Sequence, residues 1–457
     1  MEDIDTSRLP QHADAGGSSA PVTASLPTAA GARAGGRRDV SVLWCVNAVD
    51  GLGSQTSGLV FPLLLLGLGH GPGTAGMFAS AAALTGVLLG PVMAVPSDRG
   101  HRRRLMTGAA VLASLAMAGL AVSCLRHPPL WVLLGLAFTE RLCATAYETA
   151  ARGALRRLAT SDDLPRAVAG VQTGDQMALV LGPALGGILF GVGRFLPFAV
   201  DALSYVVAAV GVRAIRTPLD PAVVRGSSPV LRTGRTRTPR PAPPGTLRAG
   251  IAAVVRSPVL RLVLLWSSVA SGVLALLFYT AVFVLGTRAG GAATGAVLAA
   301  SGAAGLVGSL MAARVVRRLG ARRSLTAATW LLLPPCAALS AADGPWLWGL
   351  CFSALCLVLP VVTVVLGGAA ILAVPEDLQS RTGAVLGSAT AATAALAPAA
   401  AAALVTWGGP PAPAMTCGVV LALLAFHTQR KAPTVLRPAM SAAGHARSAG
   451  SPPGGRT

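Results

Sequence analysis

The sequence predicts an all-α polytopic membrane protein with about twelve transmembrane helices arranged as two six-helix halves. Three observations predict this fold class. Apolar runs of about 20 residues recur along the chain, and such a run spans the roughly 30 Å hydrocarbon core of a bilayer as a helix. Only 12% of the 457 residues are charged, against about 25% in soluble domains. One long basic linker interrupts the apolar runs near the middle of the chain.

The apolar runs define the expected spans, and short polar turns join neighbouring runs into hairpins. The run 382–406 is mostly alanine, which is only weakly apolar. We count it as a span because an even number returns the basic C-terminal tail to the side of the N-terminus. The expected spans cover residues 41–67, 75–96, 105–125, 130–150, 167–193, 195–213, 259–285, 291–313, 324–341, 345–373, 382–406 and 411–427.

Composition divides the chain into five segments. The two ends are rich in Ala, Gly, Ser and Pro and are expected to be disordered cytoplasmic tails. The linker is basic and rich in proline, which is typical of a connection between two membrane-embedded halves. The expected segments are the tail 1–40, the first half 41–213, the linker 214–258, the second half 259–427 and the tail 428–457.

The densest cluster of charges is Ser97–Arg104, a tight turn between two apolar runs. Short arginine-rich loops stay on the cytoplasmic side, so this turn sets the orientation of the other spans by alternation. Gly308–Leu325 repeats the pattern of Gly90–Leu105, with the end of a span, a basic turn and the start of the next span. The predicted topology places both termini in the cytoplasm and the protein in the inner (plasma) membrane.

The high positive charge does not indicate nucleic-acid binding. The formal net charge is +20, but the arginines lie between apolar runs or in the tails, which membrane topology explains. The seven cysteines show no Cys-x-x-Cys spacing, so neither disulfides nor a metal site is expected. The sequence contains no P-loop, Gly-x-Ser-x-Gly or His-Glu-x-x-His motif, which disfavours an enzyme, and no cofactor is expected.

Charged residues inside the expected spans are candidates for proton coupling or substrate binding, because burying a charge in a membrane is costly. They cluster in the first half, and the interiors of the second-half spans have essentially none. This asymmetry predicts one binding half and one mostly structural half. The candidates are Asp50 in the first span, Glu140 and Arg141 in the fourth, Asp175 in the fifth and Asp201 in the sixth.

Asp175 has the strongest positional case among these residues. It precedes Gly182 and Gly186 by seven and eleven residues, which places all three on one helix face. Glycines mark a face that packs closely against another helix. A carboxylate enclosed there would be poorly hydrated and suited to exchanging protons, and a static hydrogen bond is the alternative role.

Structural roles are also open for the other charged groups. Arg141 could form an ion pair with Asp50 or with Glu140 instead of taking part in proton transfer. Simple local pairs are expected near the ends of spans, namely Glu148 with Arg152 at i,i+4 spacing and Asp201 with Arg194 or as a helix cap.

Two motifs resemble those of the major facilitator superfamily. The turn Asp98-Arg99-Gly100-His101-Arg102-Arg103 resembles its motif A, with His101 in place of a glycine. Gly182-Pro183-Ala184-Leu185-Gly186-Gly187 resembles motif C of the proton-coupled exporters, and Arg141 resembles the arginine of motif B. Several short stretches, including Asp201-Ala202-Leu203-Ser204-Tyr205, look like the siderophore- and macrolide-efflux branch.

The resemblance implies roles for both motifs. Asp98, with Arg99, Arg102 and Arg103, would form a gating latch between the two halves in one access state. The alternative is that the turn only sets the orientation of the helices in the membrane. Gly182, Pro183, Gly186 and Gly187 would mark the fifth span as that of an exporter.

The expected function is therefore proton-coupled efflux of a small amphipathic compound, such as a drug, antibiotic or siderophore, by alternating access. The expected partners are this compound, protons and the lipid bilayer, and the expected state is a monomer. An importer of the same fold is one alternative. A membrane scaffold or receptor that does not transport is the other, and the intramembrane carboxylates disfavour it.

Overall fold

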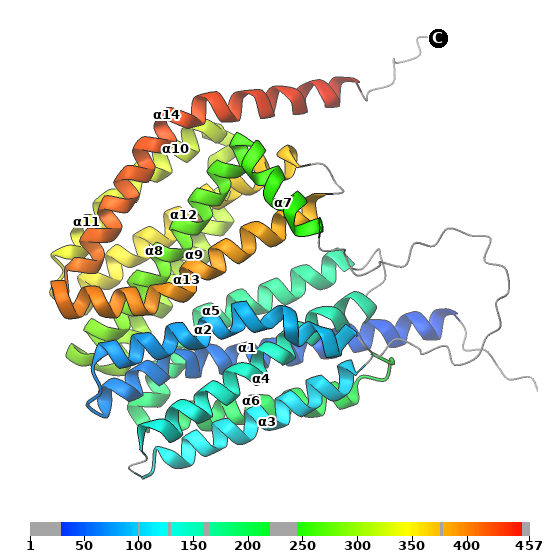
Figure 1. Ribbon diagram of the computed structural model, residues 1–457, viewed down its shortest axis with the longest axis vertical. Coiled ribbons are helices and arrows are strands. Elements are labelled where there is room, and N and C mark those ends of the chain that lie inside the picture. Colours follow the sequence, from blue (N-terminus) through cyan, green and yellow to red (C-terminus); the bar gives the residue numbers. More distant parts are fainter. Residues whose placement is uncertain are drawn as a thin grey trace, which may run out of the picture.

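The computed structural model describes residues 29–98, 101–126, 129–158, 164–219, 245–374 and 378–449. Within these residues the chain is built from α-helices, and no β-strand occurs. The predicted all-α fold is therefore confirmed. The helices form two bundles, which lie one above the other in Figure 1.

The first bundle is the lower one in Figure 1 and the second is the upper one. Helix α7 (Gly245–Arg256) packs against α8 and α13 of the second bundle. The first bundle contains α1 (Ala29–Gly67), α2 (Pro72–Asp98), α3 (Arg102–Ser123), α4 (Leu130–Leu158), α5 (Leu164–Val192) and α6 (Leu196–Ala214). The second contains α8 (Pro258–Arg288), α9 (Gly290–Leu319), α10 (Ala321–Leu331), α11 (Leu333–Ser340), α12 (Pro345–Ala373), α13 (Gln379–Gly408) and α14 (Ala412–Ala449).

Eleven helices in the described ranges are long and apolar enough to cross a membrane. The expected span 324–341 is absent from this set because it is broken into α10 and α11 at Leu332. Pro334 and Pro335 follow the break directly. A proline inside a helix removes a backbone hydrogen bond and clashes with the carbonyl four residues earlier, so the helix ends before it and restarts.

The expected tails and linker contain more helix than their composition predicts. Residues 1–28, 220–244 and 450–457 lie outside the described residues. Helix α1 begins at Ala29, α14 continues to Ala449, and α7 lies within the expected linker. Alanine is the strongest helix former, and the alanines of these segments favour the extension of neighbouring helices.

The two bundles meet through small residues near the loops α1–α2 and α5–α6. A β-carbon added to Gly187 of α5 would lie 2.9 Å from Cα of Gly295 in α9. A β-carbon added to Gly76 of α2 would lie 2.5 Å from the carbonyl oxygen of Pro398 in α13. Only glycine permits such close approach of two helix backbones. Figure 1 shows the bundles closest at this end, which we call the closed end, and farther apart at the other end.

Candidate functional site

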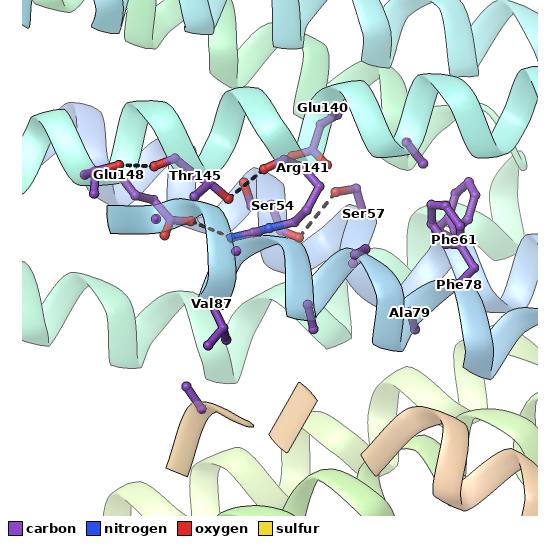
Figure 2. A pocket seen from close by; sticks show the side chains of 18 of the residues that line it. Ser54, Ser57, Phe61, Phe78, Ala79, Val87, Glu140, Arg141, Thr145 and Glu148 are labelled. Carbon is purple, nitrogen blue, oxygen red and sulfur yellow. Dashed lines mark hydrogen bonds and ion pairs between the residues drawn. The ribbon is translucent and has the colours of Figure 1, made fainter. Parts of the chain in front are cut away.

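A cavity of about 780 Å³ lies between the two bundles and is lined by both. Helices α1, α2 and α4 supply most of its wall, and α8 and α13 complete it (Figure 2). Much of the lining is apolar, and Phe61 and Phe78 lie with their ring centroids 4.9 Å apart. A cavity of this size with few polar groups has the dimensions of a site for a small organic molecule.

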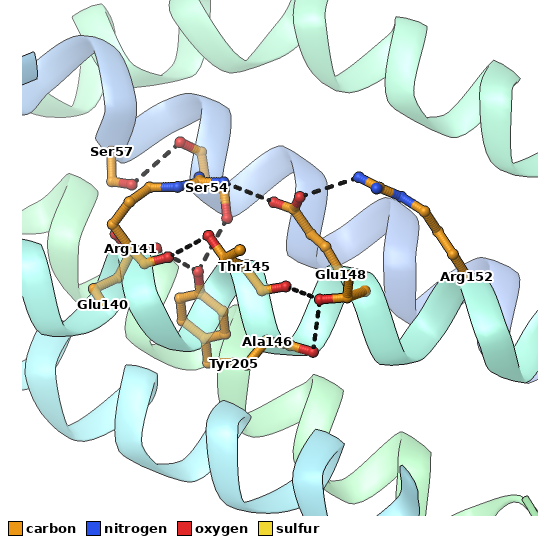
Figure 3. Close-up of polar contacts among 10 residues, drawn as sticks. Ser54, Ser57, Glu140, Arg141, Thr145, Ala146, Glu148, Arg152 and Tyr205 are labelled. Carbon is orange, nitrogen blue, oxygen red and sulfur yellow. Dashed lines mark hydrogen bonds and ion pairs between the residues drawn. The ribbon is translucent and has the colours of Figure 1, made fainter. Parts of the chain in front are cut away.

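The charged side chains of the cavity come from α4. Nη2 of Arg141 lies 3.2 Å from Oε1 of Glu148, and Nη2 of Arg152 lies 3.4 Å from Oε2 of the same carboxylate (Figure 3). The expected i,i+4 pair of Glu148 and Arg152 is thus confirmed. Arg141 pairs with Glu148, one of the cavity residues, and not with Asp50 or Glu140. Gly86 of α2 faces Arg141, since a β-carbon added to it would lie 3.7 Å from the guanidinium group, at ordinary contact distance.

Glu140 also lines the cavity but is held by a hydroxyl group behind it. The Tyr205 hydroxyl of α6 donates to Oε1 of Glu140 at 2.6 Å, and Ser54 Oγ of α1 lies 3.2 Å from the same hydroxyl (Figure 3). Glu140 and Tyr205 are buried. Buried charges require such partners, because a carboxylate without hydrogen bonds is expensive in a low-dielectric interior.

Asp201 lies beside this network and is fully buried. Its Oδ2 accepts a hydrogen bond from Ser57 Oγ at 2.6 Å, and Ser204 Oγ lies 3.1 Å from Oδ1. A β-carbon added to Gly53 of α1 would lie 2.6 Å from Oδ1, so a glycine is needed for α6 to come this close. The expectation that Asp201 pairs with Arg194 or caps its helix is wrong, because its side chain faces α1 and bonds to Ser57 there.

Asp50 lies one turn from Ser54 on α1 and is 8% exposed. Its Oδ1 accepts no hydrogen bond from the described part of the chain. The charges nearest to it electrostatically are those of Glu140, Arg141 and Glu148. Asp50 of α1 thus lies within electrostatic reach of the charged residues of α4.

Asp175 lies away from this cluster. Its side chain is exposed and does not line the cavity, so the expected enclosure by protein is wrong. The face of α5 that packs on α1 runs instead through Gly174, Ala178, Gly182 and Gly186, because β-carbons added to Gly174 and Gly186 would meet α1. Successive members of this row are four residues apart, and helices often pack along rows of that spacing.

The glycines of the motif C-like stretch hold α5 between two neighbours. Gly182 and Gly186 contact Gln55 and Thr56 of α1, whereas Gly187 contacts Gly291 and Gly295 of α9. The Pro183 carbonyl oxygen would lie 2.5 Å from a β-carbon on Gly295. The stretch is thus a packing surface shared by the two bundles.

The motif A-like turn lies partly outside the described residues. Asp98 is the last residue of α2, but its side chain and the whole of Arg99 are not described. Nη1 of buried Arg102 donates to the Gly153 carbonyl at 3.1 Å, and Arg103 donates to the Ile215 carbonyl. These two arginines bind the first bundle together.

The sequence prediction did not include four residues of the site. Ser54, Ser57 and Tyr279 line the cavity, and Tyr205 holds Glu140. Asp50, Ser54 and Ser57 have the spacing i, i+4, i+7, which marks one face of a helix. That polar stripe on the first span was the signal that could have identified the serines.

The sequence matches the Major Facilitator Superfamily over residues 43–387. It is similar to macrolide efflux protein A of Streptococcus pyogenes, with 28% identity over 198 residues, which are 40% of this chain and 48% of that protein. This chain therefore spans about half the length of that relative. An uncharacterized MFS-type transporter, YfiS of Bacillus subtilis (strain 168), is 28% identical over 124 residues, 27% of this chain and 28% of that protein.

Solved structures resemble the fold over nearly its whole length. A bacterial homologue of the human lysosomal transporter Spinster, inward-facing and unoccupied, has a TM-score of 0.64 at 13% identity and covers 88% of this chain and 98% of its own. An inward-facing bacterial homologue of the iron transporter ferroportin has a TM-score of 0.60 at 16% identity, covering 85% and 99%. At these identities the likeness concerns the fold. With the family match over three quarters of the sequence, the chain belongs to the Major Facilitator Superfamily and has the fold of a multi-pass membrane protein.

Proposed function

We propose that this transporter exports a small amphipathic compound from the cell in exchange for protons. The observation that carries the proposal is the cavity of about 780 Å³ between the bundles, whose largely apolar wall presents Glu140, Arg141 and Glu148. The apolar wall suits the body of an amphipathic compound. The carboxylates suit proton binding, because each can change its charge when the cavity changes the side to which it opens.

Orientation follows from the arginine distribution of the loops. The positive-inside bias puts both termini in the cytoplasm and the protein in the plasma membrane. The closed end, with the loop α1–α2, is then the outer end, and the cavity opens inward. Reporter fusions at Gly71 and Ser227 test this orientation, since the first should read outside and the second inside. An outside signal at Ser227 would reverse the proposed direction of the cavity.

Alternating access requires the two bundles to rock about the cavity. In the outward-open state the glycine contacts of Gly187 with Gly295 and of Gly76 with Pro398 separate, and the opposite ends approach each other. The motif A-like turn lies at those opposite ends, and a latch made by Asp98 would form there. Asp98→Asn should then lower transport without loss of membrane insertion.

Protonation alters the charged wall of the cavity in a defined way. Glu148 holds both Arg141 and Arg152. The two guanidinium groups thus share one negative charge. A proton on Glu140 removes the charge that the Tyr205 hydroxyl stabilises. Cargo and protons therefore act on one set of charged side chains in the cavity wall, Glu140, Arg141, Glu148 and Arg152.

The available energy is sufficient for export. A proton that moves inward gains about 2.3 kcal/mol per 100 mV and about 1.4 kcal/mol per pH unit. At 100 mV and one pH unit the sum is about 3.7 kcal/mol, enough for a gradient of roughly 500-fold in a neutral compound exchanged one for one. The partial similarity to a macrolide efflux protein supports export over import.

The test uses the purified protein in lipid vesicles with an acidic lumen and a fluorescent amphipathic amine outside. Molecules inserted with their cytoplasmic face outward should accumulate the dye above the level of protein-free vesicles, and an ionophore that dissipates the pH gradient should abolish the difference. Equilibration without accumulation would indicate a facilitator, and no protein-dependent flux of this dye or of a macrolide would favour the scaffold alternative.

A further inference from the structure

A second cavity, of about 810 Å³, lies where the turn between α9 and α10 meets α14. We call it the α10–α14 pocket. Arg322, Arg323 and Thr326 line it together with Trp330 of α10 and Gln429 of α14. Nε1 of Trp330 donates to Oε1 of Gln429 at 3.2 Å, which ties the two helices at the pocket. None of these groups belongs to the central cavity.

The turn between α2 and α3 is the counterpart of this turn in the first bundle, and the two turns use their arginines differently. In the first bundle Arg102 and Arg103 donate to backbone carbonyls of Gly153 and Ile215. Arg322 and Arg323 are exposed. Their backbone carbonyls accept hydrogen bonds from the Thr326 hydroxyl, but within the described ranges neither guanidinium group takes part in a hydrogen bond or an ion pair with the protein. Their guanidinium donors are thus available to a ligand.

The three helices that line the pocket carry positive charge only. Helices α9 and α10 contain no Asp or Glu between Gly290 and Leu331, and α14 contains none between Ala412 and Ala449. Arg314, Arg317 and Arg318 are exposed near the end of α9. Helix α10 also begins without a side-chain cap, so the partial positive charge of its first turn is not offset. An anion is the ligand that this field favours.

Apolar surface lies next to the arginines. Leu319 is 49% exposed and Trp330 is 46% exposed, and both line the pocket. Leu319 is the last residue of a candidate membrane span, so the pocket lies at the depth of lipid headgroups, where tryptophan is favoured. A guanidinium group binds a phosphate through two parallel hydrogen bonds. We propose that the α10–α14 pocket binds the phosphate headgroup of an acidic phospholipid.

The experiment measures binding of fluorescent phosphatidylglycerol to the full-length protein in a neutral detergent, with fluorescent phosphatidylcholine as the comparison lipid. Arg322→Gln/Arg323→Gln should weaken phosphatidylglycerol binding by at least tenfold, since each arginine near a lipid surface contributes about 1 kcal/mol. The matched control is Arg317→Gln/Arg318→Gln, which removes the same charge from exposed positions outside the pocket and should weaken binding by less than about threefold. Arg322→Lys/Arg323→Lys keeps the charge and should retain most of the preference over phosphatidylcholine.

Equal losses in the two glutamine variants would overturn the proposal, because the turn would then attract lipid only through its total charge. Water-soluble glycerol 3-phosphate provides the second arm. It should displace the lipid only at a concentration at least a hundredfold above that of the lipid. Displacement at equal concentrations would identify a site for a soluble phosphate instead. A single monodisperse peak in size-exclusion chromatography for each variant shows that the loss is not one of folding.

Discussion

The wall that α4 contributes to the central cavity carries Glu140, Arg141 and Glu148, whereas the wall from α8 and α13 carries Tyr279 and Ser388 among small residues. Both walls belong to bundles of similar size and face the same space. The two walls differ in how a charge is supported. Buried Glu140 accepts a hydrogen bond from the Tyr205 hydroxyl, which half-buried Ser54 contacts in turn, whereas the lining residues of the second wall include no carboxylate. In the proposed transport cycle we assign proton coupling to the first wall and contact with the cargo to the second. This division of roles, with proton coupling on the first wall and cargo contact on the second, can be tested by substitutions on each wall.

The largest effect is expected for Glu140→Gln. This change removes a proton-binding group from the first wall but keeps its size, so accumulation driven by a pH gradient should fall at least tenfold. Exchange of cargo down its own gradient should persist in the same vesicles. Ser388→Ala on the second wall is the matched control and should keep the pH drive. Equal losses in both variants would contradict the division of roles.

Tyr205→Phe should reduce the rate of pH-driven export by about tenfold, because a hydrogen bond to a charged group contributes about 1.5–3 kcal/mol. The cavity wall keeps its shape, so the KM for cargo should stay within twofold. Initial rates in vesicles at several cargo concentrations separate the two quantities. A rise in KM at unchanged maximal rate would place Tyr205 in cargo binding instead of charge support.

Tyr279→Ala should act in the opposite way. Loss of one aromatic contact costs about 0.5–1.5 kcal/mol, so the apparent affinity for cargo should fall by about fivefold. The dependence of export on the pH gradient should remain that of the wild type. Loss of this dependence would show that the second wall also takes part in coupling.

The smallest effect is expected for Asp175→Asn. Asp175 is exposed and lies outside the cavity lining, so pH-driven accumulation should change by less than about twofold, as for other exposed substitutions that remove no structural contact. The measurement is the same vesicle assay, with Glu140→Gln in parallel. A loss as large as that of Glu140→Gln would make Asp175 the coupling carboxylate and move the proton site to α5.

The bilayer-spanning pattern was predictable from the sequence because hydropathy is a local property of each run. The broken span at Leu332 was also visible in principle, since Pro334 and Pro335 stand within the run. Asp50, Glu140 and Arg141 were recognisable as candidates because a charged residue in an apolar run is conspicuous. The serines and Tyr205 were not recognised, because their role depends on which helices become neighbours.

Asp175 shows how a helix-face prediction fails. An ideal helix places Asp175 on the face of Gly182 and Gly186, but α5 contacts α1 along a row of residues spaced four apart. This row continues through Ala178 and Gly174. Because four residues are slightly more than one helical turn, the row moves around the helix and away from Asp175. Spacing along one helix gives the face, whereas only the crossing angle tells where along that face the neighbour lies.

The contact of Gly187 with Gly295 has a consequence for the resting population of the transporter. The two backbones approach so closely that an added β-carbon would lie 2.9 Å from the facing Cα. The attraction between them is short-ranged, and a gap of about 1 Å already removes up to about half of it. The contact therefore stabilises the closed arrangement of the two helices most strongly at close range and contributes much less once they have separated. A single methyl group at either glycine would push the bundles apart at the closed end. In the proposed orientation this shifts the equilibrium toward the outward-open conformation, with no change in any charged residue.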